Sequence, residues 1–430
     1  MSRAILWFRN DLRLADNDAL IAAVRGHNEV LPVLVIDPRQ HGPSPIGMPR
    51  SGDRRRAFLW EGVRDLEAAL RARGSALQVH AGEPAVVLEG LARKWGASTV
   101  HAQELFAQEE RSQAQAVAGV LSLQLHTPNT LLHPDDLPFA LRDLPHIFTA
   151  FRTAVERRLV VRPASAAPAL IPTPAGWSAG PPDPVCLPFT PLAPDARTVL
   201  PFHGGRAAAE ARLTHYFSTA APAHYKETRN ALLGADASSK FSPWLAQGAL
   251  GPRELYHAIK RYEAAHGANE STYWLVFELL WRDFFQFTAA KHGARIFQRR
   301  GIARRDPPHG NDAALFAQWC EGRTGQPFID ANMRELAATG WMSNRGRQNV
   351  ASFLVHDLGL DWRMGAWWFE HHLLDFDPCS NWGNWQYVAG VGNDPRAGRR
   401  FDPVRQAGLY DPDARYTRTW PYGSVPAYSP

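Results

Sequence analysis

The first 126 residues alternate short apolar runs with amphipathic stretches. Apolar residues recur at helical spacing in the stretches at 16–25, 53–73, 83–95 and 108–120. The apolar runs are typical of buried strands and cover residues 4–8, 30–36, 77–80, 99–102 and 123–126. Strands that alternate with helices in this way predict a Rossmann-like α/β domain with a doubly wound parallel sheet.

This pattern changes twice further along the chain. Residues 131–204 are rich in proline and have little periodicity, which is typical of a long connector on the surface. From residue 205 onward helical periodicity dominates, most clearly at 252–266, 271–292, 330–338, 344–358 and 361–374. We therefore expect an α/β domain at 1–130, a connector at 131–204 and an all-helical domain at 205–430.

The bulk composition restricts the function classes. Hydrophobic residues make up 45% of the 430 residues, and no apolar run approaches the roughly 18 residues that a membrane-spanning helix needs. The N-terminal apolar stretch is too short for a secretory leader, so we expect a cytoplasmic protein that does not bind membranes. A net charge of +5 is compatible with a polyanionic partner without requiring one. The three cysteines are far apart in the sequence, which predicts neither a disulfide nor a zinc site. The chain has no HExxH or serine-triad motif, which argues against hydrolytic and metal-dependent chemistry.

The segment SSKFSPWL, residues 238–245, could bind phosphate. Ser242 is a good N-cap and Pro243 suits the first helical position, so a helix should start here. Ser238, Ser239 and Lys240 place hydroxyls and a cation beside the positive end of that helix, which suits a pyrophosphate group. An ordinary capped helix is the alternative interpretation.

Two further clusters follow. Glu278 and Arg282 are four residues apart and can pair on one helix face, where Trp281 borders the carboxylate; an amphipathic core helix with a solvated ion pair is the alternative. The second cluster mixes amides, a guanidinium and carboxylates, which suits a heteroaromatic ring with several donors and acceptors: Asn344, Arg347, Asp375, Asp377 and Asn381. Trp362 and Trp385 bracket the segment that carries Asp375, Asp377 and Asn381, and they could carry an electron or could simply be core.

Taken together, the motifs resemble those of the photolyase/cryptochrome superfamily over nearly the whole chain. They are LWFRNDLRLADNDAL, YKETRN, SSKFSPWL, ELLWRDFF, WMSNRGRQ, LDWRMGA and NWGNWQYVAGVGNDPR, in that order. The strings WMSNRGRQNVASF and NWQY are similar to those of the DASH branch. Enzymes of the superfamily that repair duplex DNA usually have a second tryptophan where this chain has Tyr387.

The resemblance implies an N-terminal α/β domain, a long connector and a helical domain that binds FAD. The residues implied to hold the FAD phosphates are Tyr225, Ser238, Ser239, Lys240, Phe241 and Ser242. Glu278 and Arg282 would border the bent cofactor and the lesion cavity. The isoalloxazine ring would be surrounded by Asn344, Arg347, Asp375, Asp377 and Asn381, with Asn381 opposite flavin N5.

The activity implied by the resemblance is light-driven repair. Excited reduced FAD would donate an electron to a cyclobutane pyrimidine dimer, which splits and returns it. Trp281 and Tyr387 would stack on the flipped lesion, and Glu278 would bind its base edges. Tyr387 offers less stacking surface than a tryptophan. The resemblance to DASH proteins implies a preference for lesions in single strands, where unpairing has already happened, so we expect a monomeric enzyme that acts on UV-damaged DNA, chiefly single-stranded. Basic residues such as Arg396, Arg399 and Arg400 could contact phosphates.

Two features of the chain depart from the family pattern. The usual electron chain has three tryptophans, of which Trp385 and Trp362 match the proximal and middle ones, whereas His309 occupies the distal position. We therefore predict slower or re-routed photoreduction. The second feature is the stretch that contacts an antenna pterin, methenyltetrahydrofolate, in the family. This chain matches that stretch only loosely, and the alternative interpretation of its residues is the solvated start of a helix. The residues are Gln103, Glu104, Glu109 and Glu110.

Two other functions remain. A blue-light photoreceptor with little repair activity would change state with flavin redox, but signalling cryptochromes commonly carry an extended C-terminal tail, and this chain ends soon after NWGNWQYVAGVGNDPR. A nucleotide-binding α/β protein with an unrelated helical domain would leave the ordered motifs unexplained.

Overall fold

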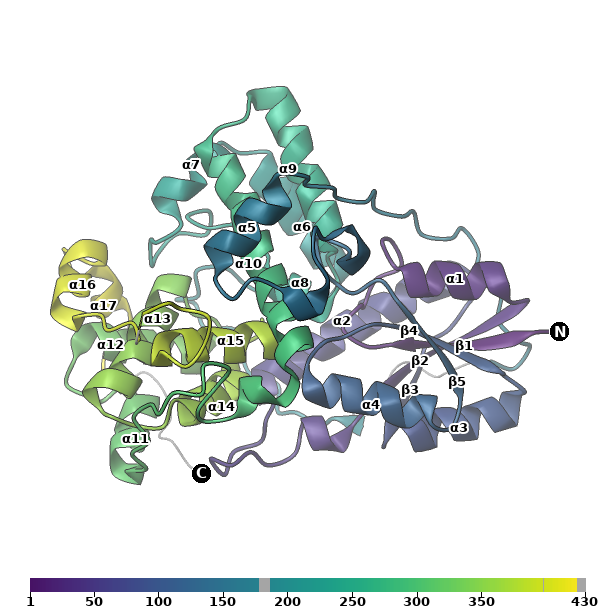
Figure 1. Ribbon diagram of the computed structural model, residues 1–430, viewed down its shortest axis with the longest axis horizontal. Helices are drawn as coiled ribbons and strands as arrows, with labels where there is room; N and C mark the ends of the chain where they lie inside the picture. Colours follow the sequence, from purple (N-terminus) through teal and green to yellow (C-terminus); the bar gives the residue numbers. More distant parts are fainter. Residues whose placement is uncertain (178–185, 397, 424–430) are drawn as a thin grey trace.

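The N-terminal part of the chain forms the predicted doubly wound parallel sheet, seen on the right in Figure 1. The computed structural model describes residues 1–177, 186–396 and 398–423. Its sheet has the order β3-β2-β1-β4-β5, with β1 (Arg3–Phe8), β2 (Glu29–Ile36), β3 (Gln78–Ala81), β4 (Thr99–Gln103) and β5 (Ser122–His126). In the register, Ala4 of β1 lies beside Val30 of β2 on one side and Thr99 of β4 on the other.

The central strand is apolar from Ala4 to Phe8 because helices cover both faces of the sheet. Leu6 and Phe8 pack in one core and Ile5 and Trp7 in another, as the alternating side chains of a strand require. The first core includes apolar residues of α1 (Asp18–Gly26) and α2 (Asp53–Arg71), and the second includes residues of α3 (Pro84–Trp95) and α4 (Gln108–Ala118).

The predicted connector contains a helix that its sequence did not reveal. Helix α5 (Phe148–Glu156) packs on the long helix α10 (Glu270–His292), with the rings of Phe151 and Phe284 at 5.3 Å. At the start of the connector, the backbone N–H groups of Leu131 and Leu132 donate to the buried carboxylate of Asp283 on α10, at 3.0 and 2.8 Å. Residues 178–185 of the connector lie outside the described residues.

The remaining helices form the left and upper parts of the molecule in Figure 1. They are α6 (Arg206–Phe217), α7 (Ala221–Thr228), α8 (Ser242–Gln247), α9 (Pro252–His266), α11 (Ala313–Cys320), α12 (Pro327–Thr339), α13 (Asn344–Ser352), α14 (Trp362–His372), α15 (Pro378–Ala389), α16 (Pro403–Tyr410) and α17 (Arg415–Thr419). The helix predicted over 344–358 is present, but it is not a regular α-helix throughout. Helix α13 ends at Ser352 and continues as a π-helical turn, Phe353–Asp357, where Phe353, Leu354 and Val355 are all buried. None of the described helices is long and apolar enough to cross a membrane.

The two parts of the molecule meet along the loop that follows β1. Arg253 at the start of α9 pairs with Asp16 at 2.6 Å. The guanidinium of Arg13 donates to the carbonyl of Gly248 at 2.9 Å. Gly248 has φ of +75°, and a side chain there would overlap the backbone of Asn10. This close approach fixes the helical part against the carboxyl ends of the strands.

Candidate functional site

A pocket in the helical part brings together the five polar residues predicted to surround a ring. Helix α13, the end of α14 and helix α15 line it, and Asn344, Arg347, Asp375, Asp377 and Asn381 all contribute to its wall. These residues are up to 37 positions apart in sequence, from Asn344 to Asn381. The fold therefore assembles the polar cluster that the sequence indicated.

An ion pair fixes the guanidinium in this pocket. Arg347 donates to Asp375 at 2.9 Å and, through Nε, to the carbonyl of Met342 at 2.9 Å. Helix α13 starts here because the side chain of Ser343 accepts from the N–H of Gly346 at 3.0 Å. The guanidinium is thus held beside the pocket by two acceptors.

The start of α15 orients the other two side chains. Asp377 is the N-cap: it accepts from the N–H of Ser380 at 2.7 Å and from the amide of Gln286 at 2.8 Å. Asn381 donates through Nδ2 to the carbonyl of Ala366 at 3.1 Å. Because this bond uses the amide nitrogen, the Oδ1 atom of Asn381 is left as a hydrogen-bond acceptor.

Two buried polar atoms in the pocket wall have no hydrogen-bond partner among the described residues. They are Oδ1 of Asp375 and Nε1 of Trp385. Buried polar atoms normally have a partner, so such atoms in a pocket indicate a polar ligand. One free acceptor, one free donor and a fixed guanidinium fit the mixed hydrogen-bonding edge of an isoalloxazine ring.

The segment predicted to bind phosphate is built differently from expectation. Ser242 is the first residue of α8 and not its N-cap; Phe241 takes the capping position without a side-chain bond. The guanidinium of Arg212 donates to the carbonyls of Ser238 and Ser239, at 3.2 and 3.0 Å, and so holds the loop. Lys240 has φ of +55° and points inward, where Nζ donates to the carbonyl of Gly234 at 2.8 Å.

Glu335 on α12 is a site residue that the sequence did not single out. It is fully buried, and burial raises its pKa to about 8, against the hydrogen bond from Tyr416 and the charges of Lys240 and Arg347. Burial lowers the pKa of Lys240 to about 7. Glu335 thus interacts electrostatically with both the phosphate segment and the ring pocket.

The predicted pair between Glu278 and Arg282 is not formed. Glu278 pairs instead with Arg229, which follows α7, and Arg282 donates to the backbone carbonyl of Asn129. Burial raises the pKa of Glu278, and the charge of Arg229 opposes this shift. Helical spacing allowed the predicted pair, but partners from other segments compete for both side chains. Tyr225 on α7 is buried close to Glu278, and burial raises its pKa well above its usual value.

Aromatic side chains of α10 and α15 meet beside Glu278. The ring of Trp281 lies edge-on to Tyr387 at 5.7 Å and stacks on Phe148 of α5 at 3.7 Å. Arg399 lies 4.5 Å above the ring of Tyr387 and donates to its hydroxyl. Trp281 and Tyr387 are both only partly buried.

The two predicted electron carriers are core residues. Trp362 and Trp385 are 0% and 2% exposed, and Trp385 also lines the ring pocket. A Cβ atom on Gly365 of α14 would be 2.7 Å from Cζ2 and Cζ3 of Trp385, so this indole lies directly on the α14 backbone. His309 is exposed.

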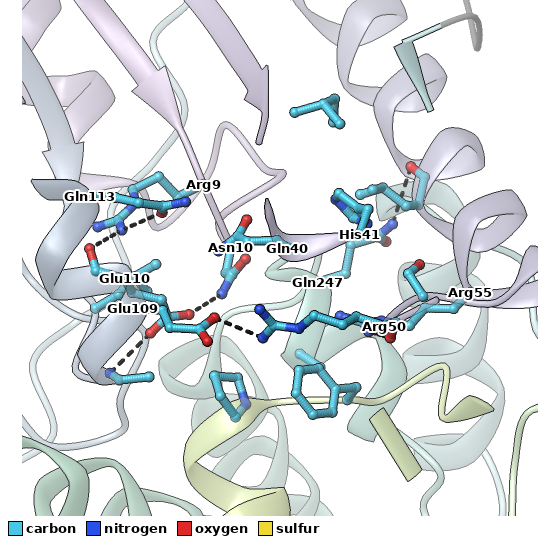
Figure 2. A pocket seen from close by; sticks show the side chains of 18 of the residues that line it. Arg9, Asn10, Gln40, His41, Arg50, Arg55, Glu109, Glu110, Gln113 and Gln247 are labelled. Carbon is cyan, nitrogen blue, oxygen red and sulfur yellow. Dashed lines mark hydrogen bonds and ion pairs between the residues drawn. The ribbon is translucent and has the colours of Figure 1, made fainter. Parts of the chain in front are cut away.

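A second pocket lies between the two parts of the molecule, at the carboxyl ends of β1 and β2 (Figure 2). Of the predicted antenna residues, Glu109 and Glu110 line it, and Gln103 and Glu104 do not. Figure 2 shows Glu109 paired with Arg50, at 2.7 Å, and Glu110 accepting from Asn10, at 3.0 Å. Burial raises the pKa of Glu110 to about 7, against the charge of Arg9.

A single layer of side chains separates the two pockets. Phe376 lines both of them, and the guanidinium of Arg55 from α2 lies 4.4 Å above its ring. Arg55 also donates to the backbone carbonyl of Glu370 on α14 at 2.8 Å. The α/β part therefore contributes directly to the support of the ring pocket.

Comparisons with known proteins identify the family of the chain. Residues 4–173 match the family model described as DNA photolyase, and residues 274–424 match the FAD binding domain of DNA photolyase. The cryptochrome DASH of Natronomonas pharaonis is 49% identical over 98% of this chain and 90% of its own length. That of Danio rerio is 48% identical over 97% of this chain and 82% of its own length.

Solved structures give the same result. The cryptochrome of Synechocystis has a TM-score of 0.94 at 44% identity and covers 98% of this chain and 88% of its own. An archaeal photolyase from Sulfolobus tokodaii, solved with two FAD molecules, has a TM-score of 0.80 at 28% identity, covering 97% of this chain and 90% of its own. The chain therefore belongs to the FAD-binding photolyase/cryptochrome family and, within it, to the DASH-type cryptochromes.

Proposed function

We propose that this protein splits cyclobutane pyrimidine dimers in blue light by electron transfer from reduced FAD, preferentially in single-stranded DNA. The observation that carries the proposal is the ring pocket, where Asn381 retains a free acceptor beside the Arg347–Asp375 pair. Helix α15 carries both Asn381 and Tyr387, so one helix joins the ring pocket to the aromatic side chains beside Glu278.

The cofactor would be held in two places. The residues proposed to hold its phosphates are Tyr225, Ser238, Ser239, Lys240, Phe241 and Ser242, and those proposed to surround its ring are Asn344, Arg347, Asp375, Asp377 and Asn381. Glu335 supports this assignment, because it interacts with both Lys240 and Arg347. Glu278 and Arg282 are proposed to border the cofactor and the lesion cavity.

Bound FAD, when reduced and excited, supplies the electron that splits the dimer and takes it back afterwards. The chain itself positions and stabilises. The guanidinium of Arg347 provides positive charge for a reduced, anionic ring, and Asp375 keeps it in place. The Oδ1 atom of Asn381 can accept a ring N–H without adding charge. No side chain needs to act as an acid or a base.

The lesion would leave the base stack before it reacts. Trp281 would stack on it, while Glu278, held by Arg229, would accept hydrogen bonds from base edges. Tyr387 is a smaller stacking surface than a tryptophan, and its ring is edge-on to Trp281. Because less stacking energy is available to offset unpairing, we propose that the enzyme favours single strands, in which no pairing is lost.

An antenna pterin near Gln103, Glu104, Glu109 and Glu110 remains part of this proposal. Reconstitution with methenyltetrahydrofolate, followed by blue-light excitation of the pterin, tests it: energy transfer to the flavin supports an antenna, and free pterin after gel filtration contradicts it.

We also propose domain boundaries at 131 and 204, which limited proteolysis tests. A monomeric state is proposed as well, and light scattering tests it.

The experiment that tests the main proposal uses chemically reduced holoprotein, blue light and oligo(dT) that contains cyclobutane dimers. We expect loss of dimers, faster in the single strand than in the same strand annealed to its complement. A Glu278→Gln variant should be slower, whereas Glu89→Gln, on the surface of α3, should match the wild type. If neither substrate loses dimers, repair is excluded and a blue-light photoreceptor becomes the better hypothesis.

A further inference from the structure

The aromatic contacts of Trp362 lead away from the position where the family has a distal tryptophan. His309 is exposed, and the ring of Trp362 contacts Trp382 of α15, edge-on, with centroids 5.6 Å apart. Trp382 in turn lies edge-on to Trp367 of α14, at 5.0 Å. A continuous line of indoles therefore runs from Trp362 to Trp367.

Trp385 joins this line as well. It lies three residues after Trp382, so both indoles project from one side of α15. That side faces α14, because Trp385 lies against Gly365 and Trp382 against Trp367. Trp382 is thus next to both of the proposed electron carriers.

Burial gives the line a direction. Trp385, Trp362 and Trp382 are at most 2% exposed, whereas Trp367 is only partly buried. An oxidised indole is a cation, and a cation is more stable where water can solvate it. A positive charge that starts at Trp385 is therefore stabilised most at Trp367.

The charged side chains around Trp367 do not oppose this direction. The guanidinium of Arg50 lies 5.2 Å from the ring of Trp367. Arg50 is paired with two carboxylates, Glu109 and Glu370, each at 2.7 Å. Arg55 also interacts with Glu370, so two guanidinium groups are balanced by two carboxylates. The surroundings of Trp367 therefore carry no net positive charge from these four groups.

We propose that Trp382 and Trp367 form the outer half of the electron relay and that Trp367 is its surface donor, in place of residue 309. This inference rests on the proposed relay through Trp385 and Trp362. Light-excited oxidised FAD takes one electron from Trp385, and the electron vacancy moves through Trp362 and Trp382 to Trp367. Trp367 then loses its indole N–H proton to water and is reduced by an external thiol, which supplies one electron and one proton.

A competing branch leaves Trp385 in another direction. The ring of Trp319 lies 6.3 Å from Trp385 and stacks on Phe316 at 5.9 Å. Both are buried, at 0% and 2% exposure, and a phenyl ring is harder to oxidise than an indole. In the described part of the chain, this branch consists of the buried rings of Trp319 and Phe316, and Trp319 serves as the matched comparison.

The test uses the holoprotein with oxidised FAD, blue light and dithiothreitol. We expect Trp367→Phe and Trp382→Phe to lose most of the photoreduction rate, and Trp319→Phe to keep it. Trp177→Phe, in the connector where Trp177 packs on the α/β core, controls for removal of a tryptophan elsewhere. Because Trp367 is partly exposed, its substitution leaves the core intact, and FAD content and urea midpoint verify this for each variant.

A second measurement does not depend on the rate. A nitroso spin trap present during illumination should label Trp367, identified by mass spectrometry of its peptide, and the label should vanish in Trp382→Phe. Normal photoreduction in Trp367→Phe, or a label on Trp319 instead, would overturn the inference. Dimer splitting by chemically reduced wild type needs no relay, so this assay tests the repair function separately. If the reduced protein splits dimers while Trp367→Phe photoreduces normally or Trp319 is labelled, only the relay is refuted. If the reduced protein splits no dimers, only the repair function is refuted.

Discussion

Replacing Gly365 by alanine should displace Trp385 from its place on α14. The added Cβ would be 2.7 Å from Cζ2 and Cζ3 of the indole and closer still to Cη2. Gly365 is in a helix, where alanine is favoured over glycine by about 0.5–1 kcal/mol. Overpacking a core costs about 1–3 kcal/mol. We therefore expect Gly365→Ala to lower the free energy of unfolding by about 1–2 kcal/mol.

Urea denaturation measures this loss, and the flavin-to-protein absorbance ratio reports whether the ring pocket has changed, since Trp385 lines it. The matched control is Gly90→Ala in α3, where an added Cβ meets nothing within 4 Å. That variant should gain up to about 1 kcal/mol. If Gly365→Ala is as stable as Gly90→Ala and retains its flavin, the packing of Trp385 against α14 is not as tight as described.

Three other expectations follow from the contacts. Asp375→Asn removes the charge that holds Arg347. Losing a charge-assisted bond of about 1.4 kcal/mol should weaken FAD binding about tenfold, as measured by titration. Unchanged affinity would contradict the role of the pair. Burial raises the pKa of Glu110 to about 7, so the folded state keeps a proton that the unfolded state releases, and stability should fall as the pH rises from the ordinary value of 4.5 to about 7. Glu110→Gln should lower this slope in urea midpoints measured across that range, while the part contributed by the buried Glu335, whose pKa is also raised by burial, should remain. If Arg396 contacts a phosphate, Arg396→Ala should lower the salt dependence of single-strand binding by about 0.7 in logarithmic slope, and an equal slope would exclude the contact.

The fold could be predicted closely where periodicity is strong. All five strands were expected within about two residues of their bounds, and inner strands such as β1 are recognisable because helices cover both faces of the sheet and make them apolar. Helix α5 was missed because it is short and lies in a proline-rich region. The π-helical turn at Phe353 was also missed, since local periodicity does not distinguish it from an α-helix.

The ring cluster could be predicted because its amides, guanidinium and carboxylates stand in recognisable motifs, and the structure adds the pair between Arg347 and Asp375. The pair between Glu278 and Arg282 was wrong because helical spacing does not reveal partners such as Arg229 from other segments. Glu335 was invisible for the same reason: its neighbours Lys240 and Tyr416 are far from it in sequence.

Phe376, shared by the two pockets, makes the flavin a natural indicator of how well the protein is assembled. One of its faces is covered by a guanidinium from the α/β part, and the residue itself lines the pocket that we propose encloses the ring. Loosening the two parts of the molecule would uncover that aromatic wall and wet the chromophore, shifting its visible absorption before any helix melts. The colour of a preparation would thus report whether the α/β part and the helical part are still in contact.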